Sequence, residues 1–195
     1  MKGFSTERIY IREISIDDLT DSVMNWFDDV ELMKYYTNSG NKITREGLLN
    51  SINQGRLNQD NFTYGIFDLT NDVMLGTVKI GPINKKQKIS DLVTLIGDRN
   101  YLGKGLSTEI IRLGNQVAFE RHDIRKLYGG MYMSNIPSIK AYTKADWLVE
   151  GRLKGFYWTD GLNEDRLLVT CLNPKYFSDE EIQEIRDNQS NFITL

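Results

Sequence analysis

The alternation of apolar and polar residues predicts a series of strands along the chain. In residues 8–13, Ile9 and Ile11 alternate with polar neighbours, which is the period of a half-buried strand. Similar runs of strand formers recur further on, and turn residues such as Thr70-Asn71-Asp72 separate neighbouring runs. The further predicted strands cover residues 62–69, 73–81, 92–96, 127–133, 147–158 and 166–172.

Apolar residues at helical spacing predict the helices. Ser15 offers an N-cap for the first one, whose inner face carries Leu19, Val23 and Trp26. A second helix is expected from Thr44. Its predicted inward residues are Leu48, Leu49, Ile52 and Leu57. The remaining predicted helices run from Leu106 to about His122, from Pro137 to about Ala145, and over residues 178–190 behind a capping box.

The order of these elements predicts the fold class. Hairpin-joined strands near the start and alternating strands and helices in the middle are typical of an α/β (α+β) protein with a mixed sheet and helices on both faces. The sequence marks no linker and no repeat. The 195 residues are therefore predicted to form one domain, residues 1–195, with a core at about 8–173 and a C-terminal helix at about 178–190.

Composition narrows the class of partner. The 24 Lys and Arg residues and 27 Asp and Glu residues give a net charge of −3 and are interspersed, which argues against nucleic acid and favours a small neutral or cationic partner. No run is long and apolar enough for a signal core or a membrane span, so a soluble, cytoplasmic protein without a membrane partner is expected. The single cysteine, Cys171, excludes an internal disulfide, and a buried structural role is expected for it.

Residues 90–120 place a strand, a glycine loop and a helix in direct succession. Gly103 and Gly105 flank Lys104, and glycines at this spacing let a ligand approach the backbone closely. A helix that begins there aims unpaired N–H groups and the positive end of its dipole at the ligand. The stretch therefore indicates an anion site. From the loop alone, an ordinary strand-to-helix turn is an equal alternative.

Two motifs resemble a known family. The first is Leu102-Gly103-Lys104-Gly105-Leu106-Ser107-Thr108-Glu109, and the second is residues 135–151, with its pattern of Asn, Ser, aromatic, Lys, aromatic and Glu-Gly. With the order of elements, they resemble the GNAT superfamily of acetyl-CoA-dependent N-acetyltransferases, in the branch of ribosomal-protein N-terminal and amino-sugar acetyltransferases. The resemblance covers roughly residues 8–171 and implies a mixed, mostly antiparallel sheet of about seven strands.

Three positions depart from the family's usual pattern. Leu102 stands where the glycine loop usually has Gln or Arg, and Ser107 stands where it usually has Gly or Ala. Asp146 replaces a Gly that the branch usually has after its short helix. Serine is small and Asp tolerates turn geometry, so the backbone of the motif is expected to keep its shape.

The resemblance implies that acetyl-CoA is the co-substrate and that its diphosphate binds the N–H groups of residues 103–107. It also implies that the strand ending at Ile96-Gly97 splays from strand 127–133, with the pantetheine arm in the gap and a backbone N–H near Leu95 facing the oxyanion. This splay is one explanation for Gly129-Gly130 inside a strand, and crowding by a neighbour is the other. The implied cofactor-binding residues are Leu95, Ile96, Gly97, Leu102, Gly103, Lys104, Gly105, Leu106, Ser107, Asn135 and Ser138.

Asn135, Ser138 and Tyr142 are expected on one face of the short helix, because 100° per residue brings positions i, i+3 and i+7 together. The resemblance implies that Tyr142 is catalytic and protonates the leaving thiolate, and that Asn135 contacts the pantetheine arm. A buried tyrosine bonded to some carbonyl is the alternative. His122 lies about 25 Å from the glycine loop along the central helix, which speaks against a catalytic role.

The residues that bind and deprotonate the amine are less well defined. Four carboxylates are candidate general bases, although each is also typical of a solvated surface: Asp28, Asp29, Glu31 and Asp91. The family's acceptor pocket corresponds to a segment whose candidate substrate contacts are Trp26, Tyr35 and Tyr36, although aromatics at these spacings are core residues as often. No metal site is expected.

The favoured acceptor is a small-molecule primary amine, specifically an amino sugar or sugar nucleotide. This preference rests on residues 76–84 and 138–141, which resemble acetyltransferases of polysaccharide pathways. The runner-up is N-terminal acetylation of a (ribosomal) protein. A non-catalytic CoA-binding protein of the same fold is an alternative of another class, and a homodimer is an open alternative for the assembly.

Overall fold

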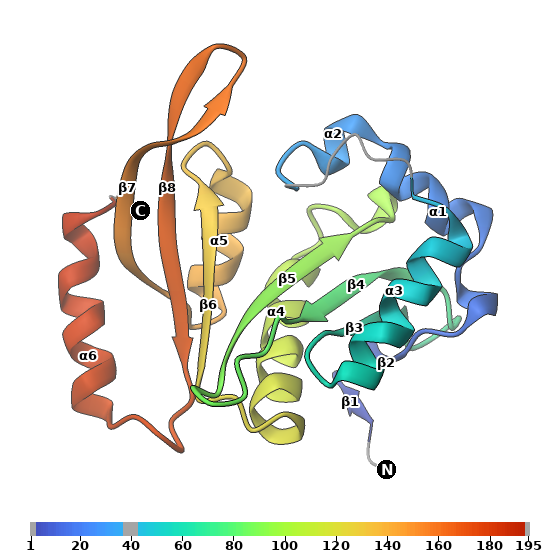
Figure 1. Cartoon of the computed structure of the whole chain (residues 1–195), viewed down its shortest axis with the longest axis horizontal. Coiled ribbons are helices and arrows are strands. Elements are labelled where there is room, and N and C mark those ends of the chain that lie inside the picture. The colour runs from blue at the N-terminus through green and yellow to red at the C-terminus, as the bar shows by residue number, and fades with distance from the viewer. Residues whose placement is uncertain (1–2, 37–42, 194–195) are drawn as a thin grey trace.

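A computed structural model describes residues 3–36 and 43–193 and contains a single eight-stranded sheet among them (Figure 1). The strand order is β1-β2-β3-β4-β5-β6-β8-β7, and β5 with β6 is the parallel pair while the other neighbours are antiparallel. The strands are β1 (Phe4–Ser5), β2 (Ile9–Glu13), β3 (Phe62–Asp68), β4 (Met74–Ile80), β5 (Ile89–Ile96), β6 (Lys126–Tyr132), β7 (Leu148–Thr159) and β8 (Leu162–Leu172).

Helices cover both faces of this sheet, as predicted. The helices are α1 (Asp21–Asp28), α2 (Val30–Met33), α3 (Arg45–Asn58), α4 (Leu106–Gln116), α5 (Ile136–Lys144) and α6 (Asp179–Asn188). The short turns are η1 (Ile16–Asp18), η2 (Arg99–Tyr101), η4 (Gln189–Asn191) and the π-helical η3 (Val117–Arg121), which continues α4. In Figure 1, α4 and α5 lie behind the sheet, α3 lies in front of it, and α6 packs against β7.

The main core lies between the sheet and α4 and α5. The predicted inner face of α4 is buried there, with Leu106, Ile110, Leu113 and Val117 all shielded from solvent. A second cluster, which includes Val23, Trp26 and Ile52, lies beneath α1 and α3. The two clusters explain why the apolar periodicity of these helices predicts their existence, because each helix buries one stripe of apolar residues against the sheet.

Two local predictions are wrong. Ser15 caps only the single turn η1, because the Asp18 side chain accepts hydrogen bonds from the Ser15 N–H and hydroxyl and closes the turn; Thr20 then caps α1. Leu57 is 74% exposed rather than inward. It lies five residues after Ile52, which at 100° per residue puts it about 140° around the helix from the buried stripe.

Cys171 is buried, as predicted, and burial raises the pKa of its thiol to about 12. Its sulfur lies 3.5 Å from the side-chain nitrogen of Asn115. A thiol that stays protonated at neutral pH is a poor nucleophile, so Cys171 acts as a small core residue. Among the helices of the described residues, none is long and apolar enough to cross a membrane.

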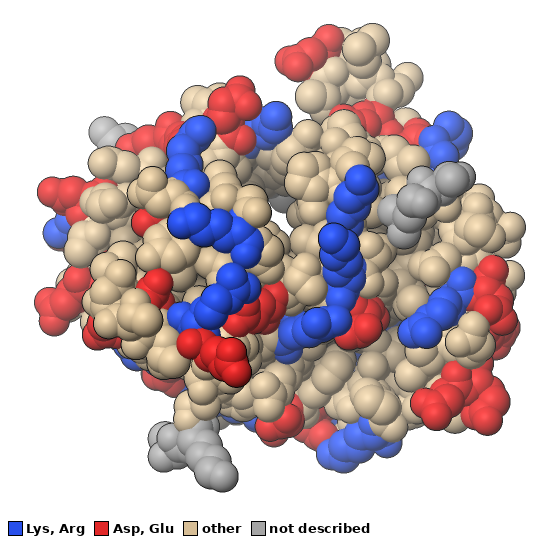
Figure 2. Space-filling view, turned by 180° about the vertical axis from the view of Figure 1, so that it is seen from behind, with Lys and Arg blue, Asp and Glu red and all other residues tan. Residues whose placement is uncertain are grey.

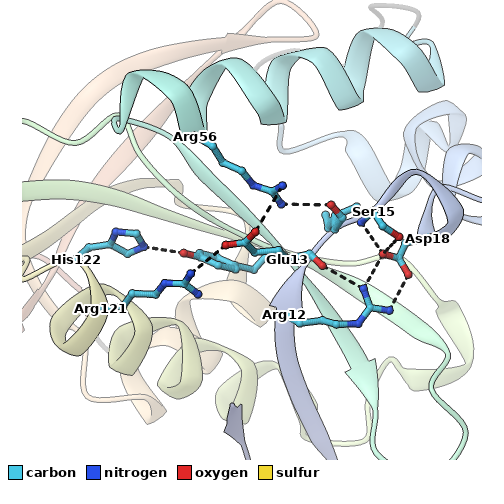
Figure 3. A network of polar contacts seen from close by, with 9 residues as sticks. Arg12, Glu13, Ser15, Asp18, Arg56, Arg121 and His122 are labelled. Atoms are coloured by element: carbon cyan, nitrogen blue, oxygen red, sulfur yellow. Dashed lines mark hydrogen bonds and ion pairs between the residues drawn. The ribbon is translucent and has the colours of Figure 1, made fainter. Parts of the chain in front are cut away.

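A polar network ties β2 to η3, the turn that continues α4 (Figure 3). Glu13 accepts a hydrogen bond from Arg121 at 3.0 Å and lies 3.8 Å from Arg56 of α3. Next to Arg121, the ring nitrogen Nε2 of His122 lies 2.8 Å from the hydroxyl of Tyr64. His122, the only histidine in the sequence, therefore contacts residues of the fold, which agrees with the expectation that it has no catalytic role.

We expect His122 to make stability depend on pH in the acid range. Burial, followed by the nearby charge of Arg121, lowers its pKa from 6.5 to about 4, so the fold favours the neutral ring. This contribution is complete above pH 6.5 and is lost as the pH falls toward 4. For a partly exposed ring the loss is on the order of 1–2 kcal/mol. Urea unfolding at pH 7.5 and 4.5 should show a larger loss for the wild type than for His122→Gln. Equal losses would contradict this role.

Candidate active site

Strands β5 and β6 pair only over their first residues and then separate. The parallel register joins Ile89–Asp91 to residues 126–128, and beyond it the two strands diverge (Figure 1). A cavity of about 420 Å³ opens in the gap, lined by residues 91–94 of β5, residues 129–132 of β6 and one face of α5. The splay implied by the family resemblance is therefore present.

The register of β5 decides which of its backbone groups face this cavity. Gly97 donates to the Leu75 carbonyl, so the backbone groups of Leu95, two residues earlier, also face β4. The carbonyl groups of Leu92 and Thr94 point the other way, into the gap. The N–H groups that face the gap therefore belong to Thr94 and Ile96. The predicted backbone N–H near Leu95 is therefore that of a neighbouring residue. Leu95 itself faces away from the gap, and its side chain lines a second cavity beneath α1 and α3.

Tyr142 projects from α5 to the edge of β5 at the bottom of the gap. Its hydroxyl donates to the Leu92 carbonyl at 3.1 Å and lies 3.4 Å from the Thr94 hydroxyl. The ring packs edge-on against Trp147 and is only 6% exposed. Burial raises the pKa of the Tyr142 hydroxyl well above its usual range. The group is therefore a protonated donor at neutral pH, held at a fixed position beside the splayed strand.

The predicted common face of the short helix is present. Asn135, Ser138 and Tyr142 all line the cavity. Asn135 is the N-cap of α5, and its side-chain oxygen accepts the Ser138 N–H at 3.3 Å. The side-chain oxygen of Asn135 thus caps the helix, and the helix in turn directs Tyr142 into the gap.

Two tyrosines that follow α2 reach both sides of the cavity. The Tyr36 hydroxyl donates to the Thr94 carbonyl of β5, and the Tyr35 ring lies 5.4 Å from the Tyr132 ring of β6. Trp26 lines neither this cavity nor the one beneath α1 and α3. It is buried over Gly97, where a Cβ atom would lie 1.9 Å from the indole ring. The substrate contact predicted for Trp26 is thus wrong, and Gly97 is explained by packing against it.

Of the four candidate bases, Asp91 is the one that lines the cavity. Asp29 caps α2 and forms an ion pair with Arg99 at 2.6 Å, and Asp28 and Glu31 are exposed. Asp91 is the last β5 residue before the strands separate. Burial raises the pKa of its carboxyl group, although a backbone hydrogen bond from Leu92 and the charges of Arg166 and Lys79 oppose the effect. A carboxylate with a raised pKa is a stronger base than an exposed one.

The glycine loop presents unpaired backbone donors. Gly103 and Gly105 both have φ = 73°, a left-handed conformation that glycine adopts without strain, and a Cβ atom at either would meet open space. Gly105 is the N-cap of α4 and has no side-chain cap, and within the described residues no acceptor bonds the N–H groups of residues 103–105. Arg8 fixes the loop by donating to the Lys104 carbonyl at 3.2 Å.

This part of the molecule also carries positive charge. Figure 2 shows the face on which α4 and α5 lie, where Lys and Arg side chains line both sides of a hollow. Free N–H groups at a helix N-terminus, a backbone without side-chain bulk and flanking cations are the features that bind phosphate groups. The anion site predicted from the sequence therefore has a suitable geometry.

Sequence reasoning missed the third wall of the cavity. Arg166 of β8 lies across Gly130, and a Cβ atom there would be 1.7 Å from the arginine Nε atom. Phe156 and Tyr157 of β7 line the cavity beside it. The only signal in the sequence was Gly129-Gly130 inside a strand, and for Gly130 the crowding explanation holds, with an arginine as the neighbour.

Comparisons with known proteins identify the family. A model described as "Acetyltransferase (GNAT) domain" matches residues 8–147. The probable N-acetyltransferase YjcK of Bacillus subtilis (strain 168) is 26% identical over 178 residues, which are 85% of this chain and 94% of that protein. Two solved structures share the fold. The spermidine N-acetyltransferase of Vibrio cholerae, in complex with CoA and spermine, has a TM-score of 0.78 at 18% identity and covers 88% of this chain and 99% of its own.

The second is the ribosomal-protein-S5-alanine acetyltransferase of Vibrio fischeri, with a TM-score of 0.76 at 20% identity over 91% of this chain and 100% of that one. The order of elements, the splayed strands and the glycine loop agree with these similarities. The chain belongs to the GNAT family of acetyltransferases.

Proposed function

We propose that this GNAT acetyltransferase moves an acetyl group from acetyl-CoA to a primary amine of a small molecule, by direct attack in a ternary complex, and that residues 1–195 form one catalytic domain. The observation that carries the proposal is the position of Tyr142. Its protonated hydroxyl lies beside the edge of β5 where the strands separate, in the same cavity as Asp91.

The residues of the α4 and α5 face suit a CoA molecule. The N–H groups of residues 103–107 would bind its diphosphate, since a diphosphate needs many donors with little side-chain bulk near them. Asn135 and Ser138 line the gap and offer polar contacts to the pantetheine arm. The acetyl thioester supplies the activated carbonyl carbon.

Three groups of the chain act in the reaction: one accepts a proton, one stabilises the developing negative charge and one donates a proton. Asp91 accepts a proton from the amine, whose nitrogen forms a bond to the thioester carbonyl carbon. An N–H group of Thr94 or Ile96 stabilises the negative charge that develops on the carbonyl oxygen. When the carbon–sulfur bond breaks, Tyr142 donates its proton to the thiolate. The amine loses one proton to Asp91 and the thiol gains one from Tyr142, so the numbers of protons released and taken up are equal.

The acceptor is proposed to be an amino sugar or a sugar nucleotide. The cavity supports this choice because several tyrosines line it, and an aromatic ring with a polar hydroxyl suits contacts to sugar rings and hydroxyls. Acetylation of a protein N-terminus is the second candidate, since a ribosomal-protein acetyltransferase shares the fold. A polyamine is a further candidate, since the spermidine N-acetyltransferase crystallised with spermine shares the fold equally well.

A thiol-release assay with acetyl-CoA tests these alternatives. The acceptors are amino sugars, sugar nucleotides, polyamines and peptides with free N-termini. We expect the largest kcat/KM for the amino sugars or sugar nucleotides. A preference for peptides would support the second candidate. Release of CoA with none of the amines would favour a non-catalytic CoA-binding protein.

A further inference from the structure

Arg166 lies in the cavity wall and its side chain forms no ion pair with a described residue. Its guanidinium carbon is 4.7 Å from the centre of the Phe156 ring, and the side chain crosses the face of Gly130. Its Nε atom is buried and has no hydrogen-bond partner. Within the described residues, Arg166 forms no ion pair. By contrast, two other arginines that are partly shielded by their surroundings, Arg12 and Arg152, each pair with an aspartate.

Two carboxylates beside Arg166 in the chain are engaged elsewhere. Asp165, its neighbour in the chain, pairs with Arg152 and Lys154, and Glu164 accepts the Ser134 N–H. Asp91 lines the same cavity and is close enough for the charge of Arg166 to lower the pKa of its carboxyl group, but the two side chains do not form an ion pair. A buried guanidinium donor without a partner destabilises the fold, because it gives up hydration and gains nothing in return. An anion bound in the cavity would satisfy it.

The cofactor is an unsuitable source of that anion, because Arg166 is on the other face of the sheet. Leu167 and Val169 are buried in the core beneath α4 and α5, and side chains alternate along a strand, so Arg166 projects from the opposite face. Its partner in the register, Tyr132, stacks on Tyr157 on that same face. The glycine loop lies at the N-terminus of α4, on the face where α4 packs. The ligand that reaches Arg166 is therefore the acceptor.

We propose that Arg166 binds an anionic group of the acceptor, a carboxylate or a phosphate, so that the preferred substrate is a small amine that carries a negative charge. This inference rests on the proposed acetyl transfer and refines its substrate. A guanidinium presents paired donors that match these two anions. Asp91 receives the amine in the same cavity, while Arg166 disfavours polyamines, which carry only positive charge. The positive charge of Arg166 in the cavity thus favours an anionic acceptor, whereas the net charge of the whole chain favoured a neutral or cationic partner.

Gly130 offers a second way to test the same contact. A methyl group at this position would collide with the guanidinium, whose flexible side chain can move aside. Gly130→Ala should therefore displace Arg166 from the cavity without removing its charge from the protein. Arg166→Gln removes the charge, and Arg166→Lys keeps the charge but loses the paired donors. Arg186→Gln, on an exposed position of α6, is the matched control.

The experiment compares acceptors that differ only in the anion. One pair is glucosamine and glucosamine 6-phosphate, and the other is an amino acid and its amide. For each protein, kcat/KM is measured at saturating acetyl-CoA, and binding to the CoA-loaded protein is measured by calorimetry. The wild type should prefer the anionic member of at least one pair, and the pair that shows the preference identifies a phosphate or a carboxylate. Arg166→Gln and Gly130→Ala should each reduce that preference about 10- to 100-fold.

The outcomes separate this inference from the acetyl transfer itself. Turnover of amines with no preference for the anionic member, or a preference that survives Arg166→Gln, would overturn the role of Arg166 and leave acetyl transfer intact. Absence of turnover with every amine would refute acetyl transfer. The calorimetric comparison of anionic and neutral probes would then test the anion site by itself. Failure of every probe to bind the wild type would overturn the site as well.

Discussion

Replacing Tyr142 with Phe is expected to lower kcat by about 100- to 10,000-fold, the range over which a positioned acid accelerates such reactions. The hydroxyl that is lost lies 3.1 Å from the Leu92 carbonyl and is the group proposed to protonate the thiolate. The phenyl ring keeps the packing against Trp147, so the affinity for CoA should change little. Steady-state kinetics with calorimetric titration of CoA separates the two effects.

The variant also loses a buried hydrogen bond, and this effect needs its own control. Leaving the Leu92 carbonyl unsatisfied costs about 1–3 kcal/mol of stability. Tyr64→Phe removes a comparable buried contact, the one to His122, at a distance from the cavity. If both variants remain folded and only Tyr142→Phe loses turnover, Tyr142 acts in the chemistry. A kcat within a few-fold of the wild type would remove it from the mechanism.

Asp91→Asn should give the second large effect, a loss of about 100-fold or more in kcat/KM. The base must be ionised, so kcat/KM of the wild type should rise with pH through the raised pKa of Asp91 and then level off. The variant should lack this acid limb. The pH profile distinguishes a base from a structural residue, because loss of packing alone would lower the whole curve without changing its shape. Asp28→Asn, an exposed carboxylate of α1, is the control and should keep the wild-type profile.

The same substitution should stabilise the folded protein. Burial raises the pKa of Asp91 above that of the unfolded chain, so the folded state binds a proton more readily and the ionised form opposes folding. This penalty is present at neutral pH and disappears as the pH falls through the folded pKa. Asp91→Asn should therefore have a higher thermal midpoint than the wild type at pH 7, and the difference should shrink toward pH 4. A lower midpoint at pH 7 would contradict the buried position of the carboxylate.

Local sequence patterns predicted much of the fold because they depend on short-range physics. The alternation in β2, the stripe of α4 and the caps at Thr44 and Ser178 each need only a few neighbouring residues, and the structure contains all of them. The glycine loop was predicted for the same reason, since its conformation follows from Gly103 and Gly105. Leu57 shows the limit, because an apolar residue five positions after Ile52 lies outside the buried stripe, on the part of the helix surface that faces solvent.

The missed parts of the site depend on contacts between distant residues. The guanidinium of Arg166 requires the glycine at Gly130, and Trp26 requires the glycine at Gly97, yet neither pair is close in the sequence. The choice of Asp91 among four carboxylates likewise depends on where β5 leaves β6. No local pattern carries this information, since it follows from strand register and from the direction in which each side chain projects.

The separation of β5 and β6 gives this sheet an edge in its interior. Unpaired strand edges at the rim of a sheet invite pairing with other proteins and hence aggregation. Here the free backbone groups lie inside the molecule, between α5 on one side and Tyr35 and Tyr36 on the other. A slender ligand can complete the ladder there by bonding to the free backbone groups of β5. The free edge of β5 therefore serves as a wall of the ligand cavity rather than as an exposed rim of the sheet.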